Sequence, residues 1–143
     1  MPSDTNTPTK SPSPIRPTDD EARALARQLM QDARFAALAT LTDAGHPMQS
    51  RVAFGLDAGG APISLVSTLA AHTQAMAARP QVSLLVGEPG AKGDPLTHPR
   101  LSLYGTAEIL PNACTAHDEM AAQYLRSHPK AKLYIGFGDF HFV

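Results

Sequence analysis

This sequence has little cysteine, little net charge and no long apolar run. Cys114 is the single cysteine among 143 residues, so the chain can form neither an internal disulfide nor a cysteine-based zinc site. The formal net charge of −1 argues against a general nucleic-acid-binding surface, although a local basic patch could still hold one phosphate group. No apolar run is long enough to span a bilayer.

Proline is concentrated at the N-terminus, where residues 1–17 are otherwise rich in serine and threonine. Such a segment cannot pack, so we predict a disordered tail over 1–17. It has no hydrophobic core of the kind found in secretion signals, and a cytoplasmic location is therefore expected. The remaining residues, 18–143, are predicted to form one domain, because the chain is 43% hydrophobic and 17% charged.

Several motifs that mark common enzymes are missing. No Gly-x-Gly-x-x-Gly or Walker-type loop follows a predicted strand, and no His-Glu-x-x-His pair is present. No serine lies in a Gly-x-Ser-x-Gly turn. Chemistry in this protein would therefore have to come from a bound cofactor.

The apolar pattern predicts an α+β fold dominated by antiparallel strands. A helix is expected over 18–33, with a capping box that begins at Thr18. The other expected elements are helices over 71–79 and 111–127, and strands over 34–41, 48–57, 61–67, 81–87, 100–110 and 132–143. The first three strands are joined too closely for parallel crossovers, so we predict a small Greek-key-like barrel of six strands with flanking helices.

Polar residues gather where the third strand gives way to the short helix. Ser67 and Thr68 end the strand, and His72 and Thr73 begin the helix. A helix start offers unpaired N–H groups and a positive dipole end, so these residues are either caps or part of an anion site. Arg51, on the second strand, is either a solvent-facing residue or the guanidinium that completes a phosphomonoester site with them.

The six histidines offer no metal-binding pair. His72 has a positional argument because it lies at the helix start, and His141 could point into a cavity from the last strand. Either could serve as an axial ligand to haem iron, since haem needs only one suitable imidazole. We expect His46 and His98 to be surface turn residues and His128 to end the last helix, and His117 lies on that helix with no obvious partner.

Four stretches, taken in order, resemble the pyridoxamine 5'-phosphate oxidase-related FMN-binding split barrels. They are "ATLTDAGHPMQSRVAFGLD", "ISLVSTLAAHTQAMAARPQVSLLVGE", "GDPLTHPRLSLYGTAEIL" and "YLRSHPKAKLYIGFGDFHF". The branch most similar is the haem-iron-utilisation (HugZ-type) branch. The resemblance implies a six-stranded split barrel, usually a homodimer with FMN at the subunit interface. By position it implies cofactor contacts from Arg51 and Val52 (ribityl and phosphate), Ser67 and Thr68 (flavin ring), His72 and Thr73 (phosphate), and Arg100 (partner subunit's cofactor).

The stretch from Ala70 to Thr73 departs from the family pattern. Pyridoxamine phosphate oxidases proper carry Ser-Arg-Lys there, so phosphate binding should be weaker and true pyridoxamine phosphate oxidation is disfavoured. The resemblance implies instead an FMN-dependent oxidoreductase, with haem or a small molecule as its acceptor. Two alternatives remain: a non-catalytic haem- or flavin-binding module, and a dimerisation unit without ligand. Relatives usually continue past the Asp-Phe motif, so domain 18–143 either belongs to a longer chain or closes with fewer residues.

Overall fold

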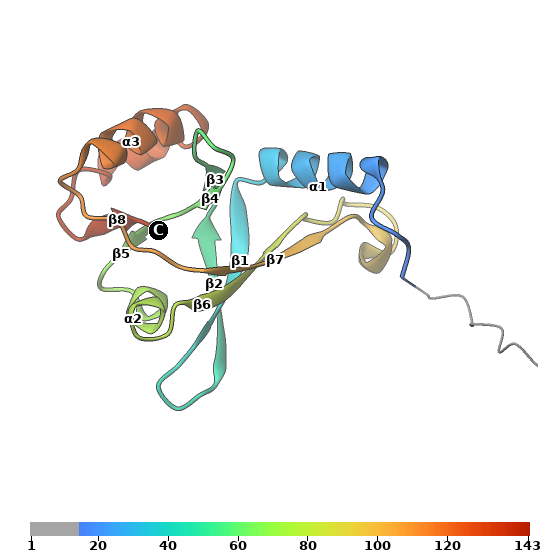
Figure 1. Cartoon of the computed structure of the whole chain (residues 1–143), viewed down its shortest axis with the longest axis horizontal. Helices are drawn as coiled ribbons and strands as arrows, with labels where there is room; N and C mark the ends of the chain where they lie inside the picture. Colours follow the sequence, from blue (N-terminus) through green and yellow to red (C-terminus); the bar gives the residue numbers. More distant parts are fainter. Residues whose placement is uncertain (1–14) are drawn as a thin grey trace, which may run out of the picture.

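The computed structural model describes residues 15–143 (Figure 1). The predicted tail over 1–17 therefore lies almost entirely outside the described residues. In chain order the elements are α1 (Asp20–Asp32), β1 (Phe35–Leu41), β2 (Pro47–Ala53), β3 (Gly55–Leu56), β4 (Pro62–Ile63), β5 (Leu65–Ser67), α2 (Ala71–Ala78), β6 (Gln81–Val86), the 3-10 turn η1 (Pro95–Thr97), β7 (Leu101–Thr106), α3 (Thr115–Ser127), η2 (Pro129–Leu133) and β8 (Phe140–Phe142).

The largest sheet has four antiparallel strands in the order β2-β1-β6-β7. Side chains alternate between its faces, so Ala36, Leu38 and Thr40 of β1 are buried while Phe35 and Leu41 are exposed. The inner face carries the first hydrophobic cluster, to which β5 and α2 also contribute: Ala36, Leu38, Val52, Phe54, Val66, Met76 and Val86. The strand pairing confirms the predicted antiparallel arrangement.

Two of the predicted strands bend and change partners. The second bends at Phe54, whose N–H donates to the Arg34 carbonyl at 2.9 Å, and it continues as β3 paired with β4. The third bends at Ser64, which exchanges two backbone hydrogen bonds of 2.9 Å with Val143 before β5 pairs with β8. The six predicted strands are thus present as eight segments in three sheets.

The helices lie around these sheets (Figure 1). Helix α2 buries Met76 in the first cluster, whereas α3 buries Tyr124 in a second cluster, where its ring meets Phe142 edge-on at 5.3 Å. Helix α1 has no buried residue, and Leu29, Met30 and Ala33 on one side of it pack against the first cluster. No helix among residues 15–143 is long and apolar enough to cross a membrane.

Four local predictions are wrong, and one of them is the strand predicted over 100–110, which ends at Thr106. The N-cap of α1 is Asp19, whose carboxylate accepts from the Ala22 N–H at 2.8 Å, and not Thr18. Helix α3 begins at Thr115 and not at residue 111, because the chain forms a turn just before it: the Leu110 N–H donates to the Phe142 carbonyl, and the Asn112 side chain donates to the Gly138 carbonyl. The last strand, predicted over 132–143, covers only Phe140–Phe142. The chain before it forms η2 and then turns, which its proline and glycine residues favour.

Candidate functional site

The turn between β5 and α2 is closed by the C-terminal part of the chain. The Ser67 hydroxyl donates to Asp139 Oδ2 at 2.7 Å and accepts from the Leu69 N–H at 3.2 Å. The Thr68 N–H donates to the Asp139 carbonyl at 2.7 Å, and the Ala70 N–H donates to the Ser67 carbonyl at 3.1 Å. Every N–H from Thr68 to Ala70 therefore has an acceptor.

The start of α2 has donors without acceptors. Its N-cap is Ala70, which has no capping side chain, and the first turn contains no acidic residue. The Thr73 and Gln74 N–H groups share the Ala70 carbonyl, so among the described residues the N–H groups of Ala71 and His72 have no acceptor. The Thr73 side chain is only 3% exposed and its hydroxyl has no partner in the part of the chain that the structure describes. This helix end is suited to an acceptor-rich, negatively charged group.

His72 contributes a neutral ring to this helix end. Its side chain is half-buried, and desolvation lowers the pKa of the imidazole from the ordinary value of 6.5. The ring is therefore uncharged near pH 7, with one nitrogen that donates and one that accepts.

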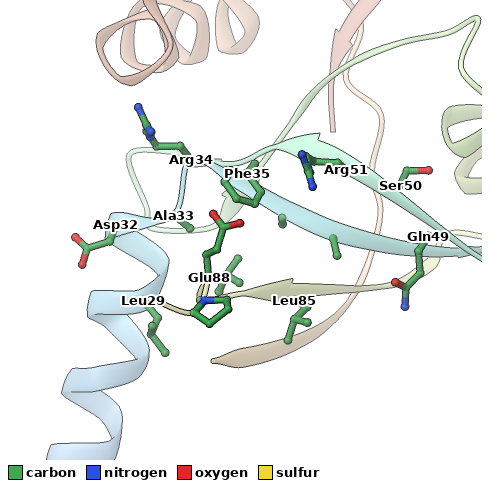
Figure 2. A pocket seen from close by; sticks show the side chains of 15 residues that line it. Leu29, Asp32, Ala33, Arg34, Phe35, Gln49, Ser50, Arg51, Leu85 and Glu88 are labelled. Atoms are coloured by element: carbon green, nitrogen blue, oxygen red, sulfur yellow. The ribbon is translucent and has the colours of Figure 1, made fainter. Parts of the chain in front are cut away.

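Arg51 lies on the outer face of the four-stranded sheet. It is paired with Ala37 across β1, and its guanidinium carbon lies 5.4 Å from the centre of the Phe35 ring. Its side chain lines a cavity of about 650 Å³ at the end of α1. Figure 2 shows Arg51 and Phe35 close together there, with Glu88 reaching toward Phe35 from the end of β6. No carboxylate among the described residues forms an ion pair with Arg51.

The predicted site residues fall into three places. Four lie together around the turn and the start of α2: Ser67, Thr68, His72 and Thr73. Strand β2, which carries Arg51 and Val52, lies beside β5, but the Val52 side chain is buried in the first cluster, so only its backbone could meet a ligand. Arg100 lies apart in the loop before β7, where its guanidinium donates to the carbonyls of Leu96 at 2.6 Å and His98 at 3.3 Å.

His141 is half-buried on β8, opposite Val66. Its Nδ1 lies 3.1 Å from the Leu110 carbonyl, and because a carbonyl only accepts, Nδ1 carries a proton; in a neutral ring the lone pair then lies on Nε2. A second cavity, of about 410 Å³ and with mainly apolar walls, lies nearby against Leu110 and Val143. His141 lines neither this cavity nor the one beside Arg51.

Asp139 is the residue of this region that sequence reasoning missed. It lies 72 positions from Ser67 and meets it only because β5 pairs with β8, in a register that sets Ser67 opposite Phe140. The segment "GFGDF" carries no local signal for that register. Within residues 15–143, no three His, Cys, Asp or Glu side chains gather where they could hold a metal ion.

A family model described as pyridoxamine 5'-phosphate oxidase matches residues 22–143. The chain belongs to this family. It is 40% identical over 103 residues to a chloroplastic heme oxygenase of Arabidopsis thaliana named HOZ, a match that covers 69% of this chain and 29% of that protein. The predicted family resemblance is confirmed.

Two solved structures give the same result. A heme binding protein from Mycobacterium smegmatis is 34% identical with a TM-score of 0.74, over 90% of this chain and 50% of that one. A protein of Agrobacterium tumefaciens is 33% identical with a TM-score of 0.77, over 92% of this chain and 57% of that one. The structural neighbours are split barrels with mixed helices and strands, which confirms the predicted fold class. The chain thus spans 29% of the Arabidopsis protein and about half of the other two.

Proposed function

We propose that this protein binds FMN, with the phosphate at the start of α2, and acts as a flavin-dependent oxidoreductase. The observation that carries the proposal is the pair of free N–H groups on Ala71 and His72 beside the unpartnered, buried hydroxyl of Thr73. A phosphate oxygen is the kind of acceptor that such a helix end favours. Family membership supports the same cofactor class, because proteins of this family bind flavin or haem.

The residues at the start of α2 offer the hydrogen-bond donors that a phosphate monoester needs, but they supply no positive charge. The first turn of α2 contains neither lysine nor arginine, so the dipole and the hydrogen bonds of this turn act without a full positive charge. Arg51, exposed and without a carboxylate partner among residues 15–143, would supply that charge from β2. We assign the phosphate to Ala71, His72 and Thr73, with Thr68 at the edge of the ring site, and propose that the Arg51 side chain, which lines a separate cavity at the end of α1, reaches the same phosphate.

Bound flavin would supply two-electron transfer, which no side chain of this site can perform. The chain's own part is to hold the cofactor and to shape its surroundings. Neutral His72 presents one donor and one acceptor. The backbone bonds of Thr68 and Ala70 keep the turn rigid, so that the free donors face one direction.

We further propose a homodimer that covers the outer face of the four-stranded sheet. Members of this family are commonly dimers. Apolar side chains are exposed on that face: Phe35 and Leu41 at 37%, Leu85 at 46% and Tyr104 at 87%. Arg51 lies among them and lines the open cavity, so a second copy seated there would enclose a ligand that reaches the guanidinium.

Titration with FMN tests the cofactor assignment. We expect the protein to take up FMN with saturation, and Arg51→Ala combined with His72→Ala to weaken binding by about 100-fold or more, since each charge-assisted or polar contact contributes roughly 1.5–3 kcal/mol. The matched control is Arg27→Ala combined with His46→Ala, which removes an exposed arginine and an exposed histidine elsewhere. Unchanged affinity in the first double variant would remove both residues from the site.

Haem is the second candidate ligand, and His141 favours it. An imidazole whose Nδ1–H is held by a carbonyl presents an oriented Nε2 lone pair, which is the arrangement typical of metal-ligating histidines. A haem titration read at the Soret band tests this idea, with His141→Ala expected to abolish a saturable shift. A band that is the same in His141→Ala would exclude this residue as the ligand.

A further inference from the structure

We propose that Asp139 is a positioning residue for the cofactor site, and that Ser67 serves it by fixing the turn instead of touching the ligand. The inference rests on the proposed FMN site, which it deepens. It changes the role that the family resemblance implies for Ser67.

The hydroxyl of Ser67 has no donor left for a ligand. A serine hydroxyl carries one hydrogen, and here that hydrogen goes to Asp139 Oδ2 at 2.7 Å. The same oxygen accepts from the Leu69 N–H at 3.2 Å. Both partners lie within the protein, so a flavin atom would have to displace one of them to gain a hydrogen bond from Ser67.

Asp139 holds the turn through two different groups. Its carboxylate accepts from Ser67, while its backbone carbonyl accepts from the Thr68 N–H at 2.7 Å. Because β5 and β8 are paired, with Ser67 opposite Phe140, these two bonds extend the sheet register by one residue into the loop. The turn cannot rotate about the end of β5 without breaking both of them.

The bonds between the turn and Asp139 determine which backbone N–H groups remain free for a ligand. The N–H groups of Thr68, Leu69 and Ala70 are used within the turn, and the first free ones belong to Ala71 and His72. If the Ser67–Asp139 bond is lost, the Leu69 N–H loses an oriented acceptor, and the start of α2 is held only by the backbone bonds of Thr68 and Ala70. The site would then bind a phosphate less tightly although no ligand contact had been removed.

Four variants test the proposal by FMN affinity: Asp139→Ala, Asp139→Asn, Ser67→Ala and the double variant Ser67→Ala with Asp139→Ala. We expect Asp139→Ala and Ser67→Ala each to weaken FMN binding about tenfold, and the double variant to be no weaker than either one, because both remove the same bond. Asp139→Asn keeps a side-chain oxygen that accepts from Ser67, so near-normal affinity is expected. Glu119→Ala, which removes an exposed carboxylate on α3, is the control and should bind as the unaltered protein does.

Amide hydrogen exchange of the FMN-free protein gives a readout that does not depend on the ligand. We expect the Leu69 and Ala70 amides to lose protection in Asp139→Ala and Ser67→Ala, and to keep it in Asp139→Asn and Glu119→Ala. If the unaltered protein binds no FMN, the proposed function fails, whereas the exchange data still test the turn. Unchanged protection in Asp139→Ala and Ser67→Ala overturns the positioning role. So does a loss of affinity in Ser67→Ala that Asp139→Ala does not share, because Ser67 would then contact the ligand itself.

Discussion

Gly87, at the end of β6, is the position where a single methyl group should do the most damage. Its φ of +98° lies in the region that L-residues rarely adopt. A Cβ built there would lie 2.6 Å from the Pro99 carbonyl oxygen and 2.7 Å from the Arg100 Cα. Both atoms belong to backbone, so neither can move aside as a flexible side chain would.

Two costs add in Gly87→Ala. The backbone conformation costs about 1–2 kcal/mol for a residue with a Cβ, and forcing an atom into a filled space costs about 1–3 kcal/mol more. The expected loss of unfolding free energy is therefore about 3 kcal/mol, which lowers the melting temperature of a domain of this size by roughly 10 °C.

Gly45→Ala is the matched control, since Gly45 has a φ of +80° and nothing within 4 Å of its Cβ position. It should carry the conformational cost alone, about 1 kcal/mol. Calorimetry or urea denaturation of both variants measures the difference. Equal losses in the two variants would refute the contact of β6 with the segment before β7, and with it the placement of Arg100.

Two further predictions concern histidines. His117 is 7% exposed, and neither ring nitrogen has a hydrogen-bond partner among the described residues, while Asp118 Oδ1 lies 3.8 Å from Nδ1. His117→Leu should therefore raise the unfolding free energy by about 1 kcal/mol in urea denaturation. A decrease would mean that the contact with Asp118 stabilises the fold. For His72, whose pKa is lowered by desolvation in the folded protein, the unfolded chain takes up a proton more readily. Stability should therefore be unaffected by this group above pH 6.5 and should fall as the pH drops below it. His72→Gln should flatten that part of the stability–pH curve, and an unchanged curve would contradict the lowered pKa.

The elements with strong local patterns were predictable from the sequence. Strand β1 and helix α2 lie within one residue of the expected ranges, because alternation over Phe35–Leu41 and the proline at position 80 are local signals. The start of α3 was not predictable in this way. Pro111 suits a first helical turn, yet hydrogen bonds from Leu110 and Asn112 tie this segment to the C-terminal part of the chain, and residues 112–114 form a turn before the helix.

The candidate site likewise contains residues that the sequence predicts and residues that only the structure places. The sequence shows where a strand ends and a short helix begins, so the polar residues at that junction could be predicted, and four of the seven predicted residues lie together there. The positions of Asp139 and Arg100 depend on the β5–β8 register and on carbonyls of the loop over 87–100. The Ser67–Asp139 contact joins residues 72 positions apart, and the carbonyls that Arg100 meets, although only two and four residues before it, belong to an irregular loop whose conformation no residue pattern predicts.

The central claim is that the start of α2, with Arg51, binds the phosphate of a mononucleotide. The most direct test compares the affinities of the protein for FMN and for riboflavin, which share the ring and differ in the phosphate. The account predicts FMN binding about 100-fold or more tighter, with that advantage lost in the Arg51→Ala and His72→Ala double variant. Equal affinities for the two flavins, or an advantage that survives in the double variant, would contradict it.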